Sequence, residues 1–122
     1  MKGAVVDALR RVVKHARTLL PTWIVIQKLP SSFDWKVDLK EDEVVLGVLQ
    51  ASDDSCSHAV TIHGDFIYDA NERIALRLCD EALDYCTSSE TVQSKFVAFK
   101  LGFRFFYEGK RPLRRSKMRL PA

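Results

Sequence analysis

The chain has 122 residues, of which 47% are hydrophobic and 29% are charged, and its formal net charge is +3. This length and composition are typical of one folded domain and exclude a disordered or fibrous protein. No apolar run approaches the roughly 18–20 residues of a membrane span, and the N-terminus lacks a signal peptide's sustained apolar stretch. The three cysteines (Cys56, Cys79 and Cys86) do not suggest a disulfide framework. We therefore expect reduced thiols in an intracellular protein, cytoplasmic or nuclear.

The first half of the chain predicts one helix followed by extended segments. Apolar residues recur at helical spacing over Ala4–Leu20, and Pro21 ends the helix. The run Trp23–Ile26 fits either a strand or a buried turn. Alternating apolar residues over Phe33–Leu39 predict a half-buried strand or extended segment. The run Glu43–Gln50 predicts a strand that is buried on both faces.

The second half predicts a sheet with a short inserted helix. The run Ile74–Leu78 fits a short strand or an extended link, and Asp80 is expected to cap a helix over residues 81–86. The clearest strand signal is Val97–Tyr107, which could bend at Gly102. This order predicts an α+β fold in which the N-terminal helix packs on an antiparallel β-sheet.

Between these halves, residues 58–71 predict a β-hairpin that carries candidate catalytic groups. The turn is either His63-Gly64, which places His58 opposite Asp69, or Gly64-Asp65, which places His58 opposite Asn71. Both registers put these side chains on one face, because side chains in a strand alternate with period 2. An acid or amide opposite a histidine can accept its N–H and fix its tautomer.

This arrangement is the base-and-orienter half of a cysteine-nucleophile active site. The alternative is a surface hairpin whose polar residues only cap the strands. A zinc site built from Cys56, His58, His63 and Asp65 is disfavoured, because His58 and His63 point to opposite faces of a regular strand. We predict no metal site, and the chain has no Gly-rich phosphate-binding loop, so we expect no cofactor.

Three segments follow one another in this part of the chain: the strand Val44–Gln50, then, after a polar loop, His58–Ile62, and then Phe66–Asn71. This arrangement resembles the C-terminal half of papain-like cysteine peptidases. The segment Ala75–Cys86 is similar to the one that follows this hairpin in members from mobile elements and viruses. The resemblance covers about a third of the chain. It implies a papain-like core in which His58 is the base and Asp69 or Asn71 is the orienting residue.

The resemblance also implies a nucleophilic cysteine at the start of a long helix, where the helix dipole lowers the thiol pKa. Ala4 occupies that position, no cysteine precedes Cys56, and only Met1 to Gly3 stand where an oxyanion-hole Gln is expected. Three interpretations are open: a degenerate relative, an engineered Cys-to-Ala change at Ala4, or a truncated gene product. Cys56 is a weaker nucleophile candidate because it sits at a loop end without a helix dipole.

The charge of the chain is unevenly distributed. Residues 31–90 hold 14 acids and 4 bases, whereas the segment from residue 110 to residue 119 holds six bases and no acid. Such a segment can bind nucleic acid or an acidic partner, or it can be a solvated end without a partner. We divide the chain into a papain-like α+β domain, residues 1–109, and a basic tail, residues 110–122. The tail's candidate binding residues are Lys110, Arg111, Arg114, Arg115, Lys117 and Arg119.

The sequence thus predicts a catalytically inactive cysteine-peptidase-like domain that binds a protein or peptide partner or serves assembly. One alternative is an active, or Cys-to-Ala trapped, cysteine protease that uses His58 and Asp69. Another is a nucleic-acid-associated protein or ribonucleoprotein subunit that binds through the basic tail.

Overall fold

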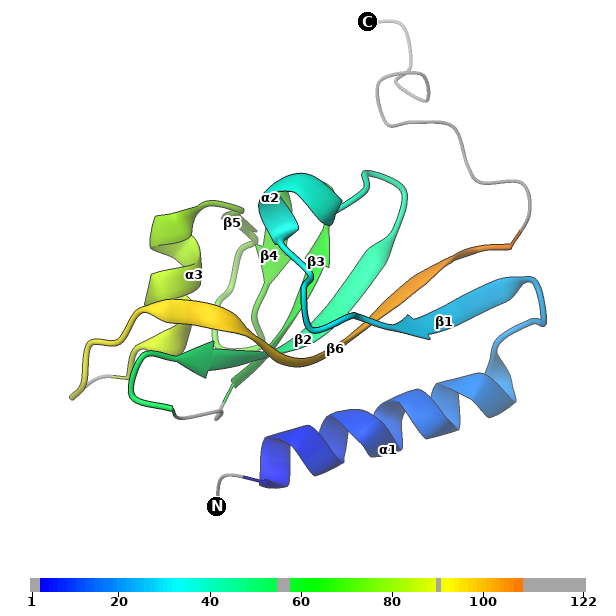
Figure 1. Ribbon diagram of the computed structural model, residues 1–122, viewed down its shortest axis with the longest axis horizontal. Coiled ribbons are helices and arrows are strands. Elements are labelled where there is room, and N and C mark those ends of the chain that lie inside the picture. The colour runs from blue at the N-terminus through cyan, green and yellow to red at the C-terminus, as the bar shows by residue number, and fades with distance from the viewer. Residues whose placement is uncertain (1–2, 55–57, 90, 109–122) are drawn as a thin grey trace, which may run out of the picture.

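The computed structural model describes residues 3–54, 58–89 and 91–108 and shows an α+β fold (Figure 1). Its six strands form one antiparallel sheet in the order β1-β6-β2-β3-β4-β5. The elements in chain order are α1 (Ala4–Leu19), β1 (Ile24–Lys28), α2 (Trp35–Asp38), β2 (Val44–Ala51), β3 (His58–His63), β4 (Phe66–Tyr68), β5 (Leu76–Arg77), α3 (Asp80–Thr87) and β6 (Phe96–Tyr107).

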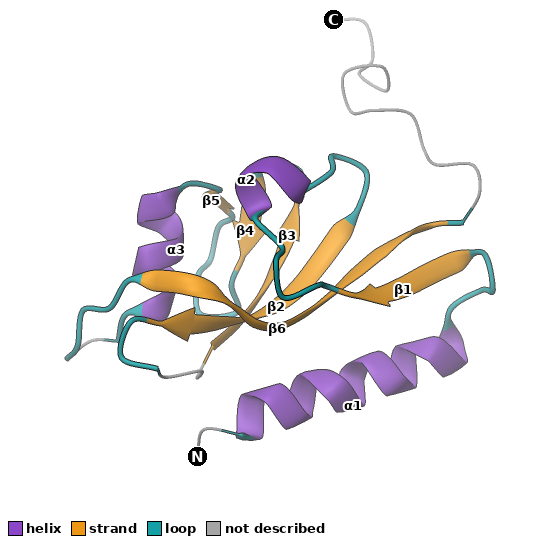
Figure 2. Cartoon of the chain, in the orientation of Figure 1, coloured by secondary structure: helices purple, strands orange, loops and turns teal. Residues whose placement is uncertain are grey.

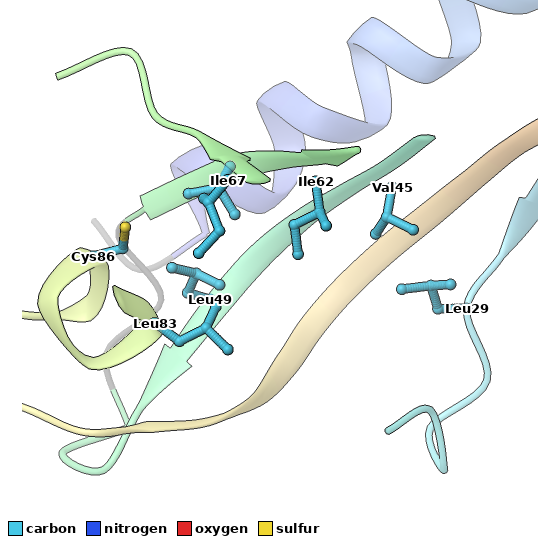
Figure 3. Packing of buried hydrophobic residues seen from close by; sticks show 8 residues of the cluster. Leu29, Val45, Leu49, Ile62, Ile67, Leu83 and Cys86 are labelled. Carbon is cyan, nitrogen blue, oxygen red and sulfur yellow. The ribbon is translucent and has the colours of Figure 1, made fainter. Parts of the chain in front are cut away.

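The sheet separates two hydrophobic clusters. Helix α1 lies on one face, and α2 and α3 lie on the other (Figures 1 and 2). The α1 cluster buries Leu9 and Val13 of the helix against side chains of β2 and β6. On the α3 face, Leu83 and Cys86 of α3 pack against the sheet (Figure 3). The sheet residues of that second cluster are Val45, Leu49, Val60, Ile62 and Ile67. Because β2 contributes to both clusters, its predicted burial on two faces is confirmed.

The hairpin β3–β4 fixes which side chains face α3. Ile62 pairs with Ile67, so the two-residue turn is Gly64-Asp65, the second of the two predicted turns. Gly64 has a φ of 61°, a conformation that glycine adopts without a steric penalty. His58 pairs with Leu49 of β2 and shares its face, because paired residues in adjacent strands project to the same side. His58 therefore lies on the α3 face of the sheet.

The segment Phe33–Leu39 is not the strand that its alternating pattern predicts, because residues 35–38 form the short helix α2. Asp34 caps this helix by accepting the backbone N–H of Lys36 at 3.0 Å. The carboxylate of Asp38 accepts the N–H of Asp34 at 2.8 Å. Local capping bonds thus compete with the extended conformation that alternation favours.

Two further boundaries differ from the sequence prediction. Asp80 is the first residue of α3 rather than its cap, and Cys79 takes the N-cap position without a side-chain bond. The ladder between β6 and β2 is irregular at two points, where it skips Lys100 and Val97 of β6. Gly102 itself pairs regularly with Gly47, so neither irregularity falls at Gly102. Two alternatives were open for each of the segments Trp23–Ile26 and Ile74–Leu78, and the structure has a strand in both places, β1 and β5.

Candidate functional site

The site centres on a close pair between a histidine and a buried carboxylate. His58 Nε2 lies 2.6 Å from Asp69 Oδ2. The side chain of Asp69 is 4% exposed and that of His58 is 23% exposed. A carboxylate can only accept, so Nε2–H is the donor. This bond uses one ring nitrogen and leaves Nδ1 to act on a neighbouring group, as a base or as a hydrogen-bond partner.

The backbone after β4 holds Asp69 in place. Strand β4 ends at Tyr68, and the chain then turns, with the N–H of Glu72 donating to the carbonyl of Asp69 at 2.9 Å. The backbone N–H of Asn71 donates to Asp69 Oδ1, also at 2.9 Å. Both oxygens of the Asp69 carboxylate are therefore engaged, one by the imidazole and one by the turn. Asn71 contributes through its backbone N–H and also lines the groove beside the pair.

Opposing effects set the ionisation of Asp69. Burial alone raises the pKa of this carboxyl, because it disfavours the charged form. The N–H of Asn71, the hydrogen bond and charge of His58, and a hydrogen bond from Cys86 together outweigh burial and hold the pKa of Asp69 below its usual value. The pair is thus built around an ionised carboxylate, which is the form that orients and stabilises an imidazole.

Cys86 approaches this carboxylate from α3. Its thiol is buried in the core cluster on the α3 face of the sheet. Burial, followed by the charge and hydrogen bond of Asp69, raises the pKa of Cys86 to about 12. Because the nucleophile in cysteine chemistry is the thiolate, Cys86 is a poor nucleophile at neutral pH. Its contact with Asp69 is a part of the site that the sequence did not predict.

A groove with a volume of about 1340 Å³ lies beside the pair, between the α3 region and the segment that leads into β6. Its lining is polar and rich in hydroxyl groups and carboxylates, with Asp69, Glu72, Glu81 and Asp84 as the acids. Glu72 accepts the hydroxyl of Tyr85 at 3.2 Å, and this bond raises the pKa of Tyr85. No feature of the sequence signalled this groove, because its walls come from segments that meet only in the fold.

The structure does not bring Ala4 to His58. Ala4 begins α1, and α1 packs against the face of the sheet opposite to the one that carries His58. A cysteine at position 4 would have the sheet between its helix and the imidazole. Within the described residues, the histidine and carboxylate that the sequence predicts come together, and the predicted nucleophile position stays apart.

Other predicted residues lie outside the described part of the chain. Cys56 and the tail residues Lys110, Arg111, Arg114, Arg115, Lys117 and Arg119 are among them. In the described ranges, no group of three or more His, Cys, Asp or Glu side chains is arranged to hold a metal ion. No helix in these ranges has both the length and the apolar character needed to cross a membrane.

The fold and the site define an α+β protein with a histidine–carboxylate pair at the edge of a polar groove. Comparisons with protein-family models, with curated proteins and with solved structures found no match to this chain.

Proposed function

We propose that this chain is a papain-like, cysteine-peptidase-type domain without catalytic activity, which binds a protein or peptide partner in the groove beside His58. The observation that carries the proposal is the 2.6 Å bond between His58 Nε2 and Asp69 Oδ2. A carboxylate bound to one ring nitrogen holds the imidazole in one tautomer and one orientation. Nδ1, the ring nitrogen that this bond does not use, can then accept a hydrogen bond from a bound partner.

The absence of activity is inferred from the thiols. Of the two cysteines in the described residues, Cys86 is buried beside Asp69, and its raised pKa keeps its thiol protonated. Cys79 is the N-cap residue of α3 and is not one of the described residues that line the groove beside His58. In the template of a serine-protease triad, loss of the nucleophile removes catalysis by on the order of a million-fold. The groove retains its binding capacity, since hydroxyl groups, amides and carboxylates can hydrogen-bond a peptide backbone.

The test for activity is covalent trapping. The protein is incubated with a peptidyl probe bearing a thiol-directed warhead, and adducts are located by mass spectrometry. We expect no adduct whose formation depends on His58. An adduct on Cys56 that forms in the parent protein and disappears in His58→Ala would overturn the proposal and establish the active cysteine protease. Cys56→Ala is the matched variant that separates this thiol from Cys79 and Cys86.

The test for binding uses nuclear magnetic resonance. A library of short synthetic peptides is titrated into isotope-labelled protein, and we expect shifts at His58 and at the backbone amide of Asn71. His58→Ala should lower the affinity for the bound peptide at least tenfold, a loss of about 1.4 kcal/mol in binding free energy, because it removes the imidazole from the groove wall. If no peptide shifts these resonances, or if His58→Ala leaves the affinity unchanged, the binding role is wrong.

The second candidate, a nucleic-acid-associated protein, is favoured by the six bases of the segment from residue 110 to residue 119. Counterion release makes such binding depend steeply on salt concentration. Removal of residues 110–122 should abolish salt-dependent RNA or DNA binding if the tail is the site. Binding that is absent, or that survives the truncation, counts against this candidate.

A further inference from the structure

The outer flank of α1 is apolar although it faces solvent. Leu9 and Val13 are buried against the sheet, as the helical stripe in the sequence predicts. Val12 and Leu19 belong to the same apolar stripe but remain 55% and 69% exposed. These two residues are spaced i, i+7, so they lie on one side of the helix. The apolar stripe of α1 is therefore wider than the part of it that packs against the sheet.

A single hydrogen bond shows which way this flank points. Arg17 Nη2 donates to the carbonyl of Ile26 in β1 at 3.3 Å. Since β1 is at one edge of the sheet, the side of α1 that carries Arg17 faces that edge. The helix has 3.6 residues per turn, so the buried Leu9 and Val13 lie between two flanks of α1. Arg17 is on one flank, and Val12 and Leu19 are on the other. The exposed apolar flank thus points along the sheet, towards β3 and β4.

The α1-side face of the sheet is also exposed to solvent at β4. Ile67 points into the core on the α3 side, so its neighbours Phe66 and Tyr68 point to the α1 side. Phe66 is 36% exposed and Tyr68 is 47% exposed. Six strands about 4.8 Å apart span about 24 Å, whereas one helix is about 10 Å wide. Figure 1 shows α1 as the helix on this face, so the described chain leaves room beside it for another helix.

The charges around this uncovered surface are basic. On α1, His15 lies one turn from both Val12 and Leu19, and Arg11 lies one turn from His15. On the sheet, His63 and Arg77 both pair with Phe66 and so project from the same face. The α1-facing positions of β3, β4 and β5 carry no acid. An occupant must therefore supply an apolar stripe and negative charge.

We propose that the surface formed by the α1 flank and the exposed face of β3–β4 binds an acidic amphipathic helix of a partner protein. The apolar stripe of that helix packs on Val12, Leu19, Phe66 and Tyr68, and its carboxylates face the basic rim. This surface lies on the opposite side of the sheet from His58. The inference is therefore independent of the proposed peptide groove.

The probe is a fluorescent synthetic helix of about 18 residues, long enough to be helical in water, with Leu at i, i+3, i+4 and i+7 spacing and Glu elsewhere. Binding is followed by fluorescence anisotropy. A scrambled peptide of identical composition and a Lys-for-Glu version are the matched controls. We expect the patterned acidic helix to bind at least tenfold more tightly than either control. Equal binding by the scrambled or basic peptide overturns the proposal.

Variants locate the surface. Val12→Glu should weaken binding at least tenfold, and Tyr68→Glu is the second variant should Val12→Glu fail to fold. Val37→Glu places the same charge at an exposed position on α2, on the other sheet face, and should leave the affinity unchanged, as should His58→Ala. Equal effects of Val12→Glu and Val37→Glu contradict the inference. Concentration-dependent self-association that Val12→Glu abolishes would assign the surface to a second copy of the chain and also overturn it.

Discussion

His58 and Asp69 are joined by a 2.6 Å hydrogen bond although the strand ladder does not pair them. The observed register, extended by three residues beyond the Thr61–Tyr68 pair, would set His58 opposite Asn71. Instead β4 stops at Tyr68 and the chain turns, so the Asp69 side chain returns to the imidazole while the Asn71 N–H binds the other carboxylate oxygen. A turn, rather than a longer strand, selects the partner of the histidine.

Asp69→Asn should destabilise the protein and change its response to acid. Loss of the buried charged acceptor at neutral pH costs about 1–3 kcal/mol. Because the pKa of Asp69 is lower in the folded state, ionised Asp69 stabilises the fold above its unfolded pKa. That contribution is lost as the pH falls through the folded pKa. The free energy of unfolding, measured in urea from pH 7 to about pH 2, should therefore fall less steeply in the variant.

Glu81→Gln is the control for this comparison, because it removes an exposed carboxylate from the same groove. It should change the free energy of unfolding at pH 7 by less than about 0.5 kcal/mol. If Asp69→Asn is as mild as this control, the buried pair does not stabilise the fold.

Cys86 should resist alkylation in the folded protein. With a pKa of about 12, its thiolate fraction at pH 8 is roughly a thousandfold below that of an ordinary thiol. Iodoacetamide labelling followed by mass spectrometry should therefore be slow under native conditions and rapid in urea. Asp69→Asn should accelerate native labelling, because the charge of Asp69 is one cause of the raised pKa. Equal labelling rates in folded and unfolded protein would show that the Cys86 thiol is neither buried nor raised in pKa.

Arg104→Met should be among the most destabilising single changes. Arg104 binds the fully buried Glu43 through two bonds of 2.8 and 2.7 Å, and its Nη2 also reaches the carbonyl of Asp38. Removing the guanidinium leaves a buried carboxylate without its charge partner, which costs about 3–5 kcal/mol. Chemical denaturation measures this loss.

Two variants test the cause of that loss. Lys36→Met breaks the exposed Lys36–Asp80 bridge of 3.1 Å and should cost less than about 1 kcal/mol. The double variant Glu43→Met with Arg104→Met should recover part of the stability, because no uncompensated charge remains. A double variant as unstable as Arg104→Met alone would assign the loss to packing instead.

Gly47→Ala should destabilise the centre of the sheet. Gly47 pairs with Gly102, and an added Cβ at Gly47 would lie 2.5 Å from Cδ1 of Phe99. The ring must shift, which costs about 1–3 kcal/mol in a packed core. Gly3→Ala is the matched control, since its Cβ would meet Asp7 at an ordinary 3.7 Å. Thermal unfolding should show a lower Tm for Gly47→Ala alone, and equal Tm values for the two variants would contradict this packing.

Periodicity in the sequence was sufficient to predict α1, the strands β2, β3, β4 and β6, and the common face of His58 and Asp69. It could not predict α2, because the capping bonds of Asp34 and Asp38 outweigh a short alternating pattern. The local sequence pattern predicts an element well where that element is long and buried. It fails where a few side-chain hydrogen bonds determine the backbone conformation.

The sequence by itself determined which side chains share a face, because helices and strands repeat with fixed periods. Only the tertiary structure decided what covers each face. It placed α1, and with it Ala4, across the sheet from His58 and brought Cys86 of α3 to Asp69. It also left Val12 and Leu19 exposed beside an uncovered part of the sheet. Packing between elements distant in the chain sets these relationships, and no local pattern in the sequence encodes them.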